Sequence, residues 1–230
     1  MCRMIIAVGE VQTRELLRDL IIIAKGNNEL HEKNPVYGKL IHGDGWGIAY
    51  LKNETWHTYK SLKPIYEDEK LLELELIKPK VIILHVRKAT VGEKVIENTQ
   101  PFSYSDMNGD FVFAHNGTIK DDMVSEKNYV NGTSDSAKWF NKILNCFEKN
   151  NLQKSFLMEN YTSANFILVT PKKIIVGQNY CENPKYCTMK LLKENNSVVV
   201  SSEILPTFKQ KEWKELDNKT IVEINLADYY

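Results

Sequence analysis

Cys2 is the residue of this chain with the greatest capacity for covalent chemistry, because it directly follows Met1. If Met1 is removed, Cys2 becomes the first residue and carries a free α-amine beside its own thiol. A thiol needs a base to become a good nucleophile. An α-amine, whose pKa is about 7.7–8.0, can accept the thiol proton near physiological pH, directly or through one water. One residue would then supply nucleophile and base. A cysteine after Met1 can equally be a coincidence, so evidence for a catalytic role of Cys2 must come from other residues.

Several short segments further along the chain support a catalytic cysteine. Met-Cys-Arg at the start is followed, in order, by HGDGWGIAY at 42–50, HVRKATVG at 85–92, NTQPF at 98–102, AHNGTI at 114–119 and TSDS at 133–136. Each segment is weak evidence alone, but in this order they resemble the class II glutamine amidotransferases, N-terminal-nucleophile (Ntn) hydrolases that begin with cysteine. The likeness runs from Cys2 to about Phe140. Near the C-terminus, VVVSSE at 198–203 with Trp213 resembles the family's closing strands.

The resemblance implies that three side chains hold the substrate glutamine. Arg87 matches the family arginine that binds the α-carboxylate, and a guanidinium can do this with two parallel hydrogen bonds. Thr90 would add a hydroxyl contact to the same carboxylate, and Asp135 matches the acid that pairs with the α-ammonium group. Each residue also has a structural interpretation. These are a surface arginine at a strand end, a threonine chosen for β propensity, and an aspartate that caps the helix expected after Ser134.

Asn116 and Gly117 match the family's oxyanion hole. The asparagine amide and the glycine backbone N–H would stabilise the oxygen that gains charge during attack on the γ-carbonyl. An Asn-Gly pair is also a strong signal for a type I′ hairpin turn. We favour a strand with a bulge over residues 111–119, since the flanking residues are apolar on both sides and bulges gather at active sites.

The hydrophobic pattern predicts an α+β protein. No linker or internal repeat divides residues 1–230, so we expect one glutaminase domain. The resemblance implies an Ntn-hydrolase four-layer αββα sandwich with two mainly antiparallel sheets. Apolar spacing predicts helices over residues 16–24, 67–77 and from Ser134 onward. Strands are predicted over residues 3–8, 46–51, 55–59, 80–89, 111–119, 165–170, 173–177, 186–192, 197–202 and 220–225.

The composition argues against several classes of function. Thirty Lys and Arg balance thirty Asp and Glu, so the basic excess that nucleic-acid-binding proteins use to neutralise phosphates is missing. The longest apolar runs, residues 20–24 and 81–84, are far shorter than the ~18 residues of a membrane span, and early charges interrupt any signal peptide. We therefore expect no nucleic-acid partner, no membrane partner and a cytoplasmic location. Reduced thiols are expected there at Cys2, Cys146, Cys181 and Cys187.

The spacing of potential ligands predicts neither a metal nor a cofactor. No CxxC pair exists, and the five histidines show no metal-binding spacing. His85 and His115 lie inside apolar segments, which is typical of core histidines. The glycines at 43, 45 and 47 lack the Lys-Ser/Thr pair of a phosphate-binding loop, so we interpret them as sites of close backbone packing.

Two positions depart from family members that are fused to amino-sugar synthases. Lys88 replaces an aromatic residue after the arginine, and Val91 replaces a histidine. Both favour a stand-alone member, whose ammonia would pass to a separate synthase subunit. The expected activity is that of an Ntn-type cysteine amidohydrolase: Cys2 attacks the γ-amide of glutamine, ammonia leaves, and water hydrolyses the γ-glutamyl thioester. Two alternatives stay open, namely another γ-glutamyl amide as substrate or, with Met1 retained, a non-catalytic scaffold subunit.

Overall fold

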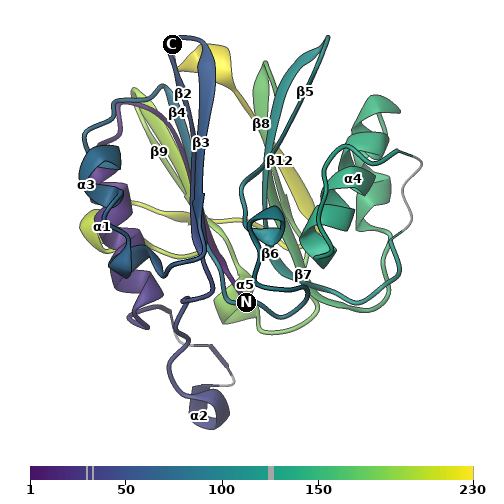
Figure 1. Ribbon diagram of the computed structural model, residues 1–230, viewed down its shortest axis with the longest axis horizontal. Coiled ribbons are helices and arrows are strands. Elements are labelled where there is room, and N and C mark those ends of the chain that lie inside the picture. Colours follow the sequence, from purple (N-terminus) through teal and green to yellow (C-terminus); the bar gives the residue numbers. More distant parts are fainter. Residues whose placement is uncertain (30, 33, 124–126, 230) are drawn as a thin grey trace.

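A computed structural model describes residues 1–29, 31–32, 34–123 and 127–229, which form four layers (Figure 1). Two β-sheets face each other at the centre. Helices α1 (Thr13–Ala24) and α3 (Leu71–Leu74) cover the outer face of one sheet, and α4 (Asp135–Glu148) covers the outer face of the other. The expected αββα sandwich is confirmed. No helix of the described residues is long and apolar enough to cross a membrane.

The first sheet has seven strands in the order β11–β9–β10–β1–β4–β2–β3, and all its strand pairs are antiparallel. The strands predicted over residues 46–51 and 55–59 pair as a hairpin that turns through Asn53 and Glu54, whose positive φ angles suit a tight β-turn. The strands are β1 (Arg3–Gly9), β2 (Trp46–Lys52), β3 (Thr55–Ser61), β4 (Val81–Val86), β9 (Lys190–Glu194), β10 (Ser197–Ser201) and β11 (Lys214–Glu215).

The second sheet has five antiparallel strands in the order β12–β8–β7–β6–β5. These are β5 (Phe102–Asp106), β6 (Gly109–Ile119), β7 (Tyr161–Val169), β8 (Lys173–Gln178) and β12 (Thr220–Asn225). The predicted strand over 111–119 is confirmed, and the pairing with β7 shifts between Thr118 and Ile119. Asn116 and Gly117 therefore lie within a strand, and not in a hairpin turn.

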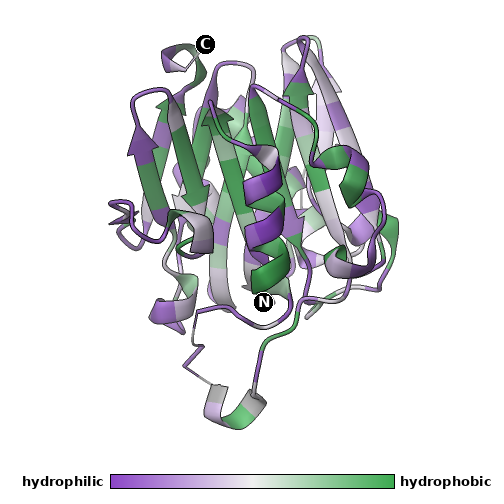
Figure 2. Cartoon of the chain, turned by 90° about the vertical axis from the view of Figure 1, so that its left-hand side faces the viewer, coloured by the Kyte–Doolittle hydropathy of each residue, from purple (hydrophilic) through white to green (hydrophobic). Residues whose placement is uncertain are grey.

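Successive side chains of β1 belong to two different hydrophobic clusters, one on each face of the first sheet. Met4, Ile6 and Val8 point between the sheets, whereas Ile5 and Ala7 pack beneath α1. Figure 2, which looks onto the side of α1 and α3, shows largely hydrophobic strands behind these helices. A third cluster lies between the second sheet and α4. Because β1 and β4 are buried on both faces, residues 4–8 and 81–84 are continuous apolar runs rather than alternating patterns.

The predicted helix over residues 67–77 is wrong in most of its length. The chain instead makes a 3₁₀ turn at Ile65–Glu67, and α3 spans only Leu71–Leu74. Asp68 between them has an extended backbone (φ −98°, ψ 112°). Its carboxylate accepts hydrogen bonds from Trp46 Nε1 (3.0 Å) and Tyr59 Oη (3.0 Å). These contacts anchor the segment to the hairpin and interrupt the helix.

The predicted strand over residues 186–192 begins too early. Helix α5 (Pro184–Cys187) takes its first part, and β9 starts only at Lys190. Asn183 has a left-handed backbone, and the proline after it occupies the first helical turn. The short helix α5 lies next to the N-terminus (Figure 1). The remaining short helix, α2 (Asn34–Tyr37), projects beyond the edge of the sandwich.

Candidate active site

The ends of neighbouring strands bring the predicted site residues together. Cys2 directly precedes β1 and Arg87 directly follows β4, and these strands pair with Arg3 opposite Val86. The thiol and the guanidinium group therefore lie at the same end of one ladder. Gly117 from β6 and Asp135 from α4 reach this point from the second sheet. Cys2, Arg87, Gly117 and Asp135 line a cavity of about 10 Å³. The rest of its lining consists of Lys88, Ala89, Thr90, Val91, Asn98, Gln100, Ser134 and Ser136.

The Cys2 thiol is buried, with 8% of the residue exposed, and its Sγ lies 3.7 Å from the carbonyl oxygen of Lys88. Burial raises the pKa of this thiol, although the positive N-terminus and Arg87 act in the opposite direction. A thiol with a raised pKa is a poor nucleophile unless a base removes its proton.

The Arg87 guanidinium is fixed by the loop that follows β4. Nη1 donates to the carbonyl of Glu93 (3.0 Å), and Nη2 donates to those of Val91 (3.4 Å) and Gly92 (3.2 Å). A guanidinium has five N–H donors, so at least two remain for a ligand. The side chain is held rigidly at the cavity, as a site for a planar carboxylate requires.

Thr90 and Asp135 are both held by hydrogen bonds at the cavity. The Thr90 hydroxyl lies 2.8 Å from that of Thr118. Asp135 accepts from the backbone N–H groups of Ile119 and Ser136, each at 2.9 Å. The helix cap is Ser134, whose hydroxyl accepts from Ala137 N (3.2 Å). The capping interpretation of Asp135 is therefore wrong, and its carboxylate instead ties β6 to α4 beside the cavity.

Asn116 is fully buried, and its side-chain amide has no hydrogen-bond partner within the part of the chain that the structure describes. An unpaired buried amide costs roughly 1–3 kcal/mol, so its presence needs a reason other than stability. Gly117 follows it with its backbone pressed against Ser163, and a Cβ at this position would overlap the Ser163 carbonyl. The Asn-Gly pair is thus a close-packed strand segment that carries an unused amide.

A comparison with known protein families decides what this arrangement belongs to. The family model described as "Glutamine amidotransferases class-II" matches residues 36–166, which is more than half of the chain. The chain belongs to the class II glutamine amidotransferases. The match includes Arg87, Asn116 and Asp135, whereas Cys2 lies before its first residue.

Similar proteins and solved structures agree with this family membership. A "Putative glutamine amidotransferase" of Haemophilus influenzae is 34% identical over 122 residues, or 50% of this chain and 39% of that protein. The glutamine phosphoribosylpyrophosphate amidotransferase of B. subtilis superposes with a TM-score of 0.67 at 20% identity, over 97% of this chain and 47% of that one. A glutamine aminotransferase class-II domain protein of Silicibacter pomeroyi gives 0.61 at 13% identity, over 97% and 95%. These structures show that the fold is that of the Ntn hydrolases.

Sequence reasoning gave no role to Asn98, which organises the wall of the cavity. Its Oδ1 accepts from the backbone N–H groups of Thr133 (2.8 Å) and Ser134 (2.9 Å). Its Nδ2 donates to Glu93 O (3.1 Å) and Thr133 Oγ1 (3.0 Å). Asn98 therefore joins the loop that holds Arg87 to the start of α4. Its place in the NTQPF segment was the only signal in the sequence.

The histidines His85 and His115 are buried in the protein core. His115 Nδ1 lies 2.8 Å from Ser136 Oγ, and burial lowers the pKa of the imidazole. His85 is also fully buried, as predicted for a core histidine. Within the described residues, no group of three or more His, Cys, Asp or Glu side chains is placed to hold a metal ion. The close packing predicted for Gly47 is confirmed, because a Cβ there would overlap the carbonyl of Gln100.

Proposed function

We propose that this amidotransferase hydrolyses the γ-amide of glutamine to glutamate and ammonia through a γ-glutamyl thioester on Cys2. The observation that carries the proposal is the convergence of Cys2, Arg87, Gly117 and Asp135 on one cavity. The unpartnered amide of Asn116 lies next to Gly117 on the same strand. The cavity residues supply a nucleophile, a cation, an anion and the backbone N–H of Gly117 as one oxyanion donor. Asn116 does not line the cavity, and its amide would supply the second oxyanion donor from the neighbouring position of β6.

The charged groups suit a zwitterionic substrate. The N–H donors that Arg87 has left would bind the α-carboxylate, with the Thr90 hydroxyl beside them. Asp135 would pair with the α-ammonium group. Such local pairing needs no long-range field, which agrees with a formal net charge of zero for the whole chain. The cavity has room for about one water molecule, so its wall must open to admit glutamine.

Groups of Cys2, Asn116 and Gly117 would carry out each step of the proposed reaction. After Met1 is removed, the Cys2 α-amine accepts the thiol proton while Sγ attacks the γ-carbon. The oxygen that gains charge receives hydrogen bonds from Asn116 Nδ2 and the Gly117 N–H. The ammonium group then returns its proton to the leaving nitrogen, and ammonia departs. A water activated by the same amine hydrolyses the thioester, which releases glutamate and restores the thiol.

The proposal also covers the extent of the domain, the destination of the ammonia and the range of substrates. The chain spans less than two fifths of the first curated relatives that it matches, and we treat residues 1–230 as one glutaminase domain. Ammonia would pass to a separate synthase subunit. Lys88 and Val91, the two positions that favour a stand-alone member, lie in the cavity wall. Hydrolysis of a γ-glutamyl amide other than glutamine is therefore the second candidate activity.

The direct test is release of glutamate and ammonia from glutamine by the purified chain, with Cys2→Ala as the inactive variant. Cys181→Ala is the matched control, because Cys181 is exposed and outside the cavity, and it should retain full activity. A panel of γ-glutamyl amides assayed in parallel ranks the two candidate substrates by kcat/KM. A chain that lacks Met1 and releases product from none of them would contradict the proposal and favour the scaffold role.

A further inference from the structure

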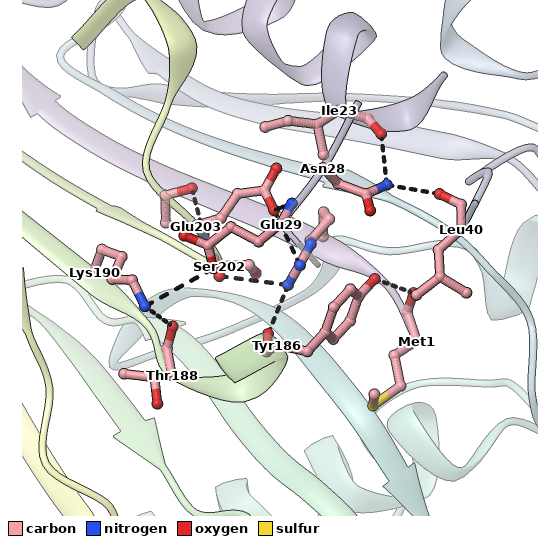
Figure 3. Close-up of polar contacts among 12 residues, drawn as sticks. Met1, Ile23, Asn28, Glu29, Leu40, Tyr186, Thr188, Lys190, Ser202 and Glu203 are labelled. Atoms are coloured by element: carbon pink, nitrogen blue, oxygen red, sulfur yellow. Dashed lines mark hydrogen bonds and ion pairs between the residues drawn. The ribbon is translucent and has the colours of Figure 1, made fainter. Parts of the chain in front are cut away.

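Two side chains that the reaction above does not use contact the Met1–Cys2 peptide group. His42 Nε2 lies 3.0 Å from the Met1 carbonyl oxygen and 3.1 Å from Tyr186 Oη. Tyr186 Oη lies 3.4 Å from the same carbonyl oxygen. Figure 3 shows the Tyr186 hydroxyl pointing at Met1 from helix α5. Neither residue lines the cavity that holds Arg87 and Asp135.

His42 is polar where packing alone would favour an apolar residue. The side chain is fully buried, and its Nδ1 has no hydrogen-bond partner among the described residues. Burial, followed by the charge of Arg3, lowers the pKa of the imidazole well below its usual range, so the ring is neutral. A buried ring nitrogen without a partner is costly, and an aliphatic side chain would avoid that cost.

Tyr186 is held rigidly in place. The Arg3 guanidinium lies 3.5 Å from the centre of the tyrosine ring, and Arg3 Nη1 donates to the Tyr186 carbonyl (2.8 Å). Arg3 is itself buried and forms an ion pair with Glu203 (3.0 Å). The hydroxyl group is therefore presented to the N-terminus in a fixed position. Arg3 directly follows Cys2, so the same contacts also fix the start of β1.

Removal of Met1 changes what these two groups face. Hydrolysis of the Met1–Cys2 amide takes away the carbonyl oxygen and leaves an amine whose nitrogen lies about 2.2 Å from the former oxygen position. We propose that His42 and Tyr186 are positioning residues that hold this α-amine so that its lone pair faces the Cys2 thiol. The inference rests on the proposed function, in which that amine is the base.

The proton inventory supports this arrangement. A neutral amine has two N–H bonds and one lone pair. With the imidazole proton on Nδ1, His42 Nε2 accepts the hydroxyl proton of Tyr186, and Tyr186 Oη in turn accepts one amine N–H. The lone pair is then free to accept the thiol proton. Tyr186 and His42 are uncharged, whereas a carboxylate in their place would raise the pKa of the amine and keep it protonated at neutral pH, when it could not accept the thiol proton.

The experiment compares His42→Leu, His42→Gln and Tyr186→Phe with the wild type as full chains. Intact mass establishes that Met1 is absent from each, and steady-state kinetics gives kcat and KM separately. We expect His42→Leu to lower kcat about 10- to 100-fold, with KM changed less than about twofold because glutamine is bound elsewhere. Tyr186→Phe should lower kcat in the same way. His42→Gln, whose amide oxygen can accept the Tyr186 hydroxyl proton, should recover part of the loss. His57→Gln, on the exposed strand β3, is the matched control and should be unchanged.

A second readout separates this inference from the proposed function. The rate of Cys2 alkylation by iodoacetamide reports thiolate formation without any substrate, and it should fall in His42→Leu. If the wild type hydrolyses no γ-glutamyl amide but this difference is present, the proposed function fails and the positioning role stands. Equal alkylation rates, a loss confined to KM, or retention of Met1 in the variants would overturn the positioning role.

Discussion

Asn116 and Asn165 lie directly opposite each other on β6 and β7, yet only one of them is hydrogen-bonded through its side chain. The Asn165 amide donates to the carbonyl of Cys187 and accepts from Asn179 N (3.0 Å). The Asn116 amide has no partner among the described residues. Two identical, fully buried side chains in one register position therefore have different tasks. Asn165 joins the sheet to its surroundings, and we propose that the Asn116 amide binds a ligand.

This contrast predicts opposite outcomes for the same substitution. Asn116→Ala should lower kcat by about 10²- to 10³-fold, since it removes one oxyanion donor, and should change the free energy of unfolding by less than about 1 kcal/mol. Asn165→Ala should lower the free energy of unfolding by roughly 1–3 kcal/mol, because it leaves buried groups unpaired. Kinetics and urea unfolding of both variants provide the measurement. Similar losses of stability in the two would contradict the assignment of Asn116.

Arg87→Lys should act mainly on substrate binding. Lysine keeps the charge but loses the planar fork and the bonds to the carbonyls of Val91, Gly92 and Glu93. We expect KM for glutamine to rise about 10- to 100-fold. Arg18→Lys on the exposed side of α1 is the control and should not change KM. An unaltered KM in Arg87→Lys would show that the arginine serves only the loop.

Asn98→Ala should affect both the cavity and the fold. The variant loses the contacts that connect the Arg87 loop to the start of α4, so backbone groups of Thr133 and Ser134 lose their acceptor. We expect a loss of about 1–3 kcal/mol in the free energy of unfolding, accompanied by a higher KM. Asn108→Ala, in the exposed turn before β6, should leave both quantities unchanged. A loss of stability with an unchanged KM would show that the Asn98 contacts stabilise the fold but do not contribute to substrate binding.

The buried histidines predict acid sensitivity. Burial lowers the pKa of His85 to about 3, and it also lowers the pKa values of His42 and His115. Above the unfolded-state pKa of about 6.5, all three are neutral in both states. As pH falls below that value, the unfolded chain binds protons that the native chain does not. The stability present at neutral pH is then lost, by about 1.4 kcal/mol per pH unit for each histidine.

Urea unfolding between about pH 7.5 and 5.5 measures this slope, in a range above most carboxylate titration. His85→Leu should reduce the slope by the contribution of one histidine, whereas His57→Leu, at an exposed site on β3, should not change it. An equally steep slope in His85→Leu would mean that other groups cause the acid sensitivity.

Much of this fold could be predicted where hydrophobic spacing is strong. The stripe of Ala137, Phe140, Ile143 and Leu144 became the buried face of α4, and the apolar run before Arg87 became β4. Cys2 directly precedes one such segment and Arg87 directly follows another, so the antiparallel pairing of β1 with β4 brings the two residues together. Their catalytic roles stay predictions, since they depend on the resemblance and on a substrate.

The remaining features depend on contacts between distant residues, which spacing does not encode. Asn98 bonds to Ser134, and His42 contacts the Met1 carbonyl, across 36 and 41 positions of the chain. Asp68 interrupts a helix that its neighbours favour, because Trp46 and Tyr59 lie close enough to bind its carboxylate. In each case a polar side chain satisfies partners that only the folded chain brings near.

The central claim is that Cys2 acts as an N-terminal nucleophile, and intact mass spectrometry before and after addition of a glutamine-mimicking electrophile tests it most directly. We predict a purified chain that lacks Met1 and gains one adduct, which peptide mapping places on Cys2 and not on Cys146, Cys181 or Cys187. Excess glutamine should slow the labelling. A chain that retains Met1, an adduct on another cysteine, or no adduct would contradict the account.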